Sequence, residues 1–316
     1  MSFKLLCDPR SLFDSRVYRT QKGQQHCPRS LEQLGWKPSN YFALLLSFSF
    51  PPSALGLASE NCVDTLDQLL GRTLIIVAHP DDEAVACAAL MQRMREPYVL
   101  FCTDGGPLDV YFWGRYGSRQ AYSLMRKEEA RVALSHVPVN DLEFLKTRDN
   151  EHIIDQQLFQ HLPEVTEAVS DVVQRVQPQA LLTLAYEGGH PDHDSCNFIT
   201  SIIARQRSLP AWEMPIEPLF KKVERNFQKL RSAPQPAIQL HPTADEIARK
   251  HQVLEAYASQ GDLAYLDSVL ETFRPLPAYD YTRPPHDGVL NYESWQWSMT
   301  GQQVSAAFEA YLASNA

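Results

Sequence analysis

The pattern of apolar and polar positions becomes regular from about residue 72 onward. Four short apolar runs have the composition of buried strands: TLIIVA (73–78), YVLFCT (98–103), LEFL (142–145) and ALLTLA (180–185). Apolar residues at helical spacing predict helices over residues 83–95, over 118–137 and in a segment ending near Gln177. Strands that alternate with helices predict an α/β fold of Rossmann-like type, with a mostly parallel sheet flanked by helices on both faces.

The C-terminal third continues this pattern less regularly. WEMPIEPLF (212–220) and PAIQL (236–240) are expected to be edge strands, and Thr243 before Glu246 marks the start of a capped helix over 243–259. A further helix is predicted near 300–314. We expect residues 61–316 to form a single domain in which these C-terminal elements provide a lid over the site.

Residues 1–60 lack a sustained period and are expected to be a poorly ordered N-terminal extension or a signal segment. The apolar run YFALLLSFSFPPSALGLA (41–58) is broken by two prolines. Its uninterrupted part is far shorter than the roughly 20 residues that a stable membrane span needs. Lys37 before this run and the small residues Gly56 and Ala58 after it keep a secretion signal around residues 37–58 as an alternative.

Two of the predicted strands end in loops that are rich in histidine and aspartate, AHPDDE (78–83) and EGGHPDHD (187–194). A helix start explains one or two of these acids, with Asp82 as N-cap and Glu83 in the first turn. Helix capping does not explain the remaining members: His79 and Asp81 in the first loop, and His190, Asp192 and His193 in the second.

Adjacent carboxylates repel one another unless a cation neutralises them, and a divalent metal is the simplest such cation. Strand ends of this kind are where ligands bind in parallel sheets. Imidazole nitrogen and carboxylate oxygen suit catalytic zinc, which keeps three protein ligands and an open position for water. The same two-histidine, one-carboxylate set also suits ferrous iron in oxygenases, so ligand chemistry alone does not name the reaction.

Charge and cysteine content narrow the range of partners. The net charge of −9 argues against a dedicated nucleic-acid binder, and a small molecule is the expected partner, with a homo-oligomer left open. The six cysteines include no CxxC pair, and Cys87, Cys102 and Cys196 lie in apolar segments. This usage fits a reducing compartment, so we expect a cytoplasmic protein.

The two loops together resemble those of the LmbE-like or PIG-L family of metal-dependent N-acetylglucosaminyl deacetylases. AHPDDE after a strand, followed more than a hundred residues later by HPDH, carries the resemblance, which is strongest from about 73 to 205. It extends through TDGG (103–106), through Arg126 and Glu129, and through FLKTRD ending at Asp149. KHQVLEAYASQ (250–260) and TRPPHDGVLNYE (282–293) resemble the family more loosely.

The resemblance implies a role for each matched residue. His79, Asp82 and His193 would hold the metal, and Asp81 would be the general base. His190 would stabilise the oxyanion or protonate the leaving amine, and Asp192 would orient or charge a neighbouring ring. Arg126 and Asp149 would bind sugar hydroxyls. The expected cofactor is Zn²⁺, with Fe²⁺ as the alternative.

Aromatic residues leave two further questions open. Family members often carry a tyrosine close before HPDH, whereas here Gly188 and Gly189 occupy those positions and Tyr186 is the nearest tyrosine. The aromatic loop at 105–118 could be a wall of a sugar site, a hydrophobic plug or a subunit contact. Trp295 and Trp297 are expected to belong to the core.

The sequence therefore predicts metal-dependent hydrolysis of the N-acetyl group of an N-acetylglucosamine-type sugar or conjugate. Three alternatives remain: another amidohydrolase, an iron oxygenase, and a sugar-binding protein without turnover. Asp81 separates the last from the enzymes, because a binder needs the ligands but has no use for a spare base.

Overall fold

The structure is a computed structural model of the chain and describes residues 65–216, 236–267 and 270–315. By its internal contacts the chain divides into two units, Met1–Val63 and Asp64–Ala316. The prediction made for residues 1–60, and the part of the predicted strand beyond residue 216, lie outside the described residues. Within the described residues, no helix is both long enough and apolar enough to cross a membrane.

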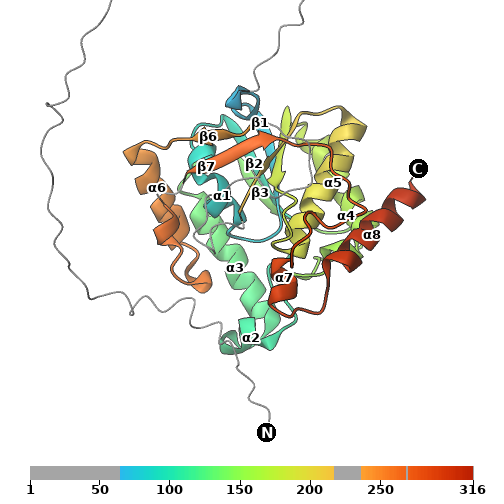
Figure 1. Cartoon of the computed structure of the whole chain (residues 1–316). Helices are drawn as coiled ribbons and strands as arrows, with labels where there is room; N and C mark the ends of the chain where they lie inside the picture. The colour runs from blue at the N-terminus through green and yellow to red at the C-terminus, as the bar shows by residue number, and fades with distance from the viewer. Residues whose placement is uncertain (1–64, 217–235, 268–269, 316) are drawn as a thin grey trace, which may run out of the picture. The chain divides into compact units, whose positions relative to one another are not determined.

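A seven-stranded sheet in the order β3-β2-β1-β4-β5-β7-β6 forms the centre of the second unit (Figure 1). Its strands are β1 Arg72–Val77, β2 Glu96–Phe101, β3 Asp141–Phe144, β4 Ala180–Leu184, β5 Ala211–Met214, β6 Ile238–Leu240 and β7 Glu271–Pro275. The first five strands in this order are mutually parallel, while β7 runs antiparallel to both β5 and β6.

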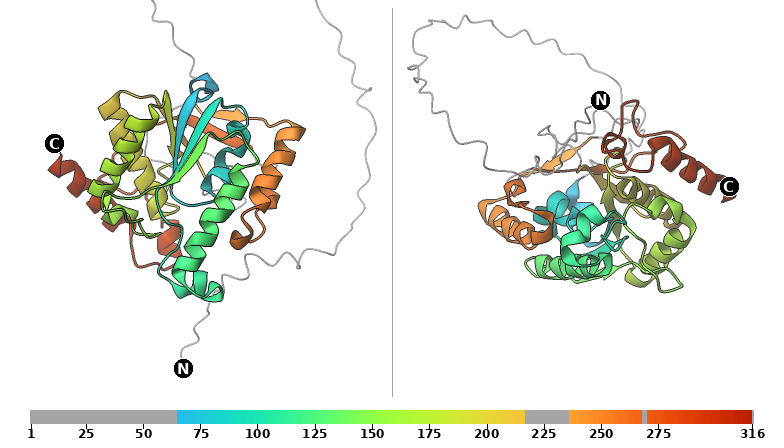
Figure 2. Two further views of the ribbon diagram at one scale, coloured as in Figure 1. Left: turned by 180° about the vertical axis from the view of Figure 1, so that it is seen from behind. Right: turned by 90° about the horizontal axis from the view of Figure 1, so that it is seen from below.

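Helices cover both faces of this sheet. The α-helices are α1 Asp82–Met91, α2 Val110–Trp113, α3 Arg119–Leu134, α4 Leu162–Val176, α5 Pro191–Arg207, α6 Ala244–Glu255, α7 Asn291–Ser294 and α8 Gly301–Ser314. Short 3₁₀ turns occur at Leu66–Leu69, Gly114–Tyr116, Leu158–Gln160, Ala258–Gln260 and Ala264–Leu266. Helices α1, α3 and α6 pack together as one layer, and α4, α5 and α8 as another (Figures 1 and 2).

The predicted α/β fold is confirmed, and the reason lies in burial on both faces. All five residues of β4 are buried, as are five of the six residues of β1, so apolar side chains are favoured at every position rather than at alternate ones. The helix predicted at 243–259 is found as α6, and its capping box joins Thr243 and Glu246.

One predicted strand has a different place in the sheet. The segment at 212–220 was expected at an edge, but β5 pairs with both β4 and β7 and is therefore internal. Trp212, in β5, is almost fully buried. The edge prediction is confirmed for β6, which lies at the end of the strand order.

Among the five parallel strands, the chain changes direction across the sheet at one point. From β1 the chain moves outward through β2 to β3, then returns to the other side of β1 with β4 and continues to β5. The gap between β1 and β4 is thus the switch point, where ligands bind in open α/β sheets. The two histidine-rich loops leave the sheet at the ends of these two strands.

A buried ion pair ties the layer of α1 to the antiparallel end of the sheet. Helix α1 is irregular at Cys87 (φ −146°, ψ 20°). Just beyond this point, the carboxylate of Glu271 in β7 accepts hydrogen bonds from the amides of Ala89 (2.8 Å) and Leu90 (2.9 Å). Lys250 in α6, which is fully buried, donates to Glu271 Oε1 at 2.7 Å and to the Val85 carbonyl at 3.1 Å.

Replacing Lys250 by Met should destabilise the fold by about 3 kcal/mol, because the carboxylate of Glu271 would stay buried without its counter-charge. Urea unfolding measures the difference. Lys146, whose ammonium donates to Asn150 at an exposed turn, provides the control, and Lys146→Met should change stability by less than about 0.5 kcal/mol. Equal losses for the two variants would show that the buried pair has no special role.

Candidate metal centre

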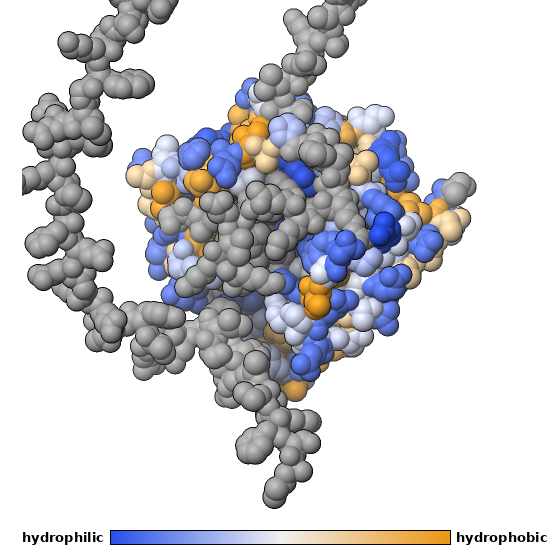
Figure 3. Space-filling model, viewed as in Figure 1, coloured by the Kyte–Doolittle hydropathy of each residue, from blue (hydrophilic) through white to orange (hydrophobic). Residues whose placement is uncertain are grey.

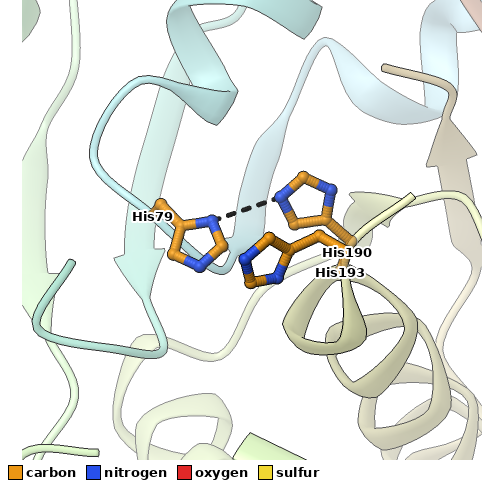
Figure 4. Close-up of side chains that lie close together, drawn as sticks. All are labelled: His79, His190 and His193. Carbon is orange, nitrogen blue, oxygen red and sulfur yellow. Dashed lines mark hydrogen bonds between the residues drawn. The ribbon is translucent and has the colours of Figure 1, made fainter. Parts of the chain in front are cut away.

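The two strand-end loops bring three histidines to one place. His79 follows β1, while His190 is the N-cap of α5 and His193 lies in its first turn. Pro191 at the first position of α5 favours a helix start there. Figure 4 shows the three imidazole rings turned toward one another, with a dashed line between His79 and His193.

The residues predicted to hold a metal lie at the spacing that a metal requires. His79 Nδ1 and His193 Nε2 are 3.2 Å apart. Asp82 Oδ1 lies 3.1 Å from His193 Nε2, and Asp82 Oδ2 lies 3.6 Å from His79 Nδ1. Ligand atoms that surround a tetrahedral zinc ion at about 2.0–2.1 Å are about 3.3–3.4 Å from one another. The donor atoms of His79, Asp82 and His193 therefore fit around one ion of this size.

The other nitrogen of His79 fixes the orientation of its ring. His79 Nε2 lies 3.2 Å from Asp155 Oδ1 and 3.2 Å from Asp192 Oδ2. Burial lowers the pKa of His79, but the neighbouring carboxylates, Asp155 foremost, raise it well above its usual value. A ring that donates from Nε2 presents the lone pair of Nδ1 to the other two donors, as histidine ligands of metals commonly do.

Asp192 is itself held rigidly. Its side chain is fully buried and accepts hydrogen bonds from the backbone amides of Gln156 (2.6 Å) and Leu158 (3.0 Å). The ring that this acid orients is that of His79, whereas its backbone amide donates to His190 Nδ1 at 3.1 Å. The sequence predicted that Asp192 acts on a neighbouring ring. In the structure Asp192 contacts two rings, those of His79 and His190.

Asp82 does not cap α1, contrary to the capping interpretation of the sequence. Asp81 occupies the N-cap position, and Asp82 is the first residue of the helix. The Asp82 carboxylate reaches back and accepts from the amides of Ala78 (3.1 Å) and His79 (2.8 Å). Although burial alone would raise it, His193 and His79 hold the pKa of Asp82 well below its usual range. An ionised, fixed carboxylate is what a metal ligand requires.

Asp81 lies beside the donor triangle in a strained backbone conformation, with φ of 125°. Its carboxylate pairs with Arg126 Nη2 at 3.3 Å, and Arg126 also donates to the carbonyls of Gly105 (2.7 Å) and Pro80 (2.6 Å). Burial raises the pKa of Asp81 to about 6, with Arg126 acting in the opposite direction. Arg126, predicted to bind sugar hydroxyls, is thus bound to the protein itself and holds Asp81.

Glu83 supports the loop that carries Asp81. It accepts a hydrogen bond from the amide of Asp81 at 3.3 Å and another from the hydroxyl of Tyr257. Burial raises the pKa of Glu83 to about 8, so this acid adds little negative charge near neutral pH. Tyr257 belongs to the segment KHQVLEAYASQ, which links that segment to the site.

His190 forms the other side of the centre. Its Nε2 lies 3.4 Å from Asp155 Oδ1, and its ring centroid is 4.3 Å from that of His79. Because Nδ1 accepts from the Asp192 amide, the neutral ring carries its proton on Nε2. Burial, with His79 next to it, lowers the pKa of His190.

A second set of donors adjoins the first. Atoms of His79, Asp155, His190 and Asp192 also lie within 4.8 Å of one another, as do those of the three histidines. Four protein ligands would close a tetrahedral ion, as in structural sites, whereas the triangle of His79, Asp82 and His193 leaves a position for water. The triangle is therefore the better candidate for a catalytic ion.

Sequence reasoning missed Asp155, which adjoins His79, His190 and Arg126. Asp155 lies in the segment IIDQQ (153–157). The only local signal for it is an acid that follows two apolar residues. Asp149 is exposed in the turn after β3, and its role in substrate binding stays a prediction. Tyr186 is buried away from the donors, and its hydroxyl donates to the Arg283 carbonyl at 2.8 Å.

The fold and the centre together define a doubly wound α/β protein with a histidine-aspartate site at its switch point. Residues 74–204 match the model of the family described as PIG-L, GlcNAc-PI de-N-acetylase. The resemblance to the LmbE-like or PIG-L family, inferred from the two loops, is thereby confirmed for this part of the chain.

Two curated relatives are deacetylases by name. A probable N-acetyl-alpha-D-glucosaminyl L-malate deacetylase 2 of Bacillus subtilis (strain 168) is 30% identical over 132 residues, covering 39% of this chain and 56% of the relative. A 1D-myo-inositol 2-acetamido-2-deoxy-alpha-D-glucopyranoside deacetylase of Nocardioides sp. is 28% identical over 176 residues, covering 47% and 57%. The chain thus spans somewhat more than half the length of these relatives.

Solved structures agree in fold. A triple mutant of the deacetylase of the teicoplanin pathway has a TM-score of 0.53 at 18% identity, covering 66% of this chain and 99% of that one. The A40926 pseudoaglycone deacetylase has a TM-score of 0.51 at 20% identity, covering 65% and 96%. At such identities the likeness establishes the shared fold.

Replacing His193 by Ala should reduce bound zinc to less than about a tenth of the wild-type stoichiometry, because one of three protein ligands is lost. Elemental analysis after reloading with zinc and desalting measures this. His251→Ala is the matched control, since His251 pairs with Asp267 and Glu255 on the surface and should leave the metal content unchanged. Full zinc content in the His193 variant would contradict the assignment.

Proposed function

We propose that this protein is a zinc-dependent hydrolase that removes the acetyl group from an N-acetylglucosamine-type sugar or sugar conjugate. The observation that carries the proposal is the triangle of His79 Nδ1, His193 Nε2 and Asp82 at spacings of 3.1–3.6 Å, with Asp81 beside it. The PIG-L match over residues 74–204 and the names of both relatives support the substrate class.

His79, Asp82 and His193 would hold the ion. When bound, such an ion polarises an amide carbonyl and lets water supply hydroxide near neutral pH. Zinc suits two imidazoles and one carboxylate with an open position, and ferrous iron remains the alternative ion.

Asp81 would be the general base. It borders the triangle without belonging to it, and its pKa of about 6 lets it take a proton from water near neutral pH. Arg126, at 3.3 Å, holds the carboxylate in place. Asp81 is the N-cap residue of α1, but with its strained φ and with its amide bound to Glu83 its carboxylate makes no capping hydrogen bond to the helix.

His190 would complete the reaction on the opposite side. Hydrolysis breaks the amide C–N bond, leaves the hydroxyl of water on the acetyl carbon and requires a proton on the departing nitrogen. The neutral His190 ring, with Nε2–H near Asp155, is suited to stabilise the oxyanion, and once charged it would deliver that proton. Asp155 and Asp192 position the rings of His190 and His79.

Replacing Asp81 by Asn should lower the rate of acetate release from N-acetylglucosamine conjugates by about 10²- to 10⁴-fold while zinc content stays constant. The change preserves the shape of the side chain and removes its negative charge and its ability to accept a proton. Asp171→Asn is the matched control, because this acid pairs with Arg148 on the exposed surface and should leave the rate unchanged. Acetate release and elemental analysis on the same preparations measure both effects.

Three results would redirect the assignment. Wild-type acetate release in the Asp81 variant would remove this residue from the reaction. Sugar binding without turnover in the wild-type protein would favour a binding protein. Activity that requires dioxygen would favour an iron oxygenase, whereas hydrolysis proceeds equally well without it.

A further inference from the structure

Two tryptophans outside the matched region lie in a row beside the metal centre. Both were expected in the core; Trp295 is instead 44% exposed, whereas Trp297 is partly buried and packs against the core. The Trp297 ring is 5.0 Å from the His190 ring, with their planes at 76°. The rings of Trp295 and Trp297 are themselves 5.0 Å apart, so the pair extends from the centre to the surface.

The segment that carries these rings is anchored to the loop that carries His190. The amide of Asn291, at the start of α7, donates to the Gly188 carbonyl at 2.9 Å. A Cβ added at Gly188, where φ is 71°, would lie 2.6 Å from Leu290. Gly188, two residues before His190, thus allows Leu290 to pack against that loop. In Figure 3 a small apolar patch lies near α7.

The backbone after α7 is shaped to present Trp297. Gln296, between the two tryptophans, has φ of 59°, which side-chain-bearing residues adopt infrequently. The chain then turns back, and the Trp297 amide donates to the Tyr292 carbonyl at 3.1 Å. Strain of this kind persists where surrounding contacts impose it, and here its effect is to bring Trp297 against His190.

The more exposed residues of the centre include His190, which Trp297 contacts. Side-chain exposure is 21% for Asp81 and 12% for His190, against 8% or less for His79, Asp82 and His193. A substrate therefore meets the centre first at Asp81 and His190, which flank the three buried donors. Trp297 borders that approach at His190.

We propose that Trp297, extended by Trp295, is a platform for the pyranose ring of the substrate, a specificity-determining contact that rests on the proposed function. The sugar ring of an N-acetylated hexosamine is bonded directly to the amide nitrogen. If His190 serves that nitrogen, the ring must lie on the His190 side, against Trp297. Indole faces pack well on the C–H faces of a pyranose, and tryptophan holds such a contact with few rotatable bonds.

Two substrates that share one amide test this platform. N-acetylglucosamine carries the pyranose ring, and N-acetylethanolamine carries the same acetamide without it. Trp297→Ala should lower kcat/KM for N-acetylglucosamine by roughly tenfold, through KM, and leave that for N-acetylethanolamine within about twofold. Trp297→Phe, which keeps an aromatic face, should recover most of the loss. Tyr265→Ala removes an exposed aromatic elsewhere and should change neither value.

Equal losses on the two substrates would overturn the platform, because they would show that Trp297 acts by packing His190. No loss on either substrate would overturn it as well. Unchanged zinc content in each variant verifies that the centre is intact.

If the wild-type protein releases acetate from neither compound, the proposed function fails for the free sugar while the platform can still be decided. Calorimetric titration of the zinc-loaded Asp81→Asn protein with N-acetylglucosamine would then compare Trp297→Ala with Tyr265→Ala in that background. A roughly tenfold weaker Kd for the Trp297 variant alone supports the platform, and equal Kd values contradict it.

Discussion

The centre of this protein is governed by the cost of placing like groups together in a buried space. His79 Nδ1 and His193 Nε2 face each other at 3.2 Å, and the carboxylates of Asp81, Asp82, Asp155 and Asp192 surround them. Arg126 offsets part of this negative charge, and protonation of Glu83 near neutral pH reduces it further. A cation bound between Asp82 and the imidazoles of His79 and His193 would neutralise the remaining negative charge.

The sheet makes this cluster attainable. Because β1 and β4 are neighbours that lead to opposite halves of the sheet, their loops meet at the switch point although they are more than a hundred residues apart. Asp192 then fastens the 156–158 backbone to His79, which brings Asp155 into the centre. His79 lies between two sets of acids, one at each ring nitrogen, and its orientation decides where an ion can bind.

The sequence predicted those features that leave a local pattern of residues, and it did not predict those that depend on distant contacts. The parallel strands and the HPDD and HPDH loops were predictable, because burial on both faces and strand-end acids leave local patterns. Asp155, the strand β7 and the place of Trp297 were not, because each depends on a contact made across the fold. Asp149 was selected by its motif, yet six residues further on a plain IID segment supplies the buried acid.

The most direct test is the position of zinc in crystals of the metal-loaded protein, located by anomalous diffraction at the zinc edge. The account predicts one peak about 2.0–2.1 Å from His79 Nδ1 and His193 Nε2 and in contact with Asp82. A peak on the other side of the ring, bound by His79 Nε2 with Asp155 and His190, would contradict it.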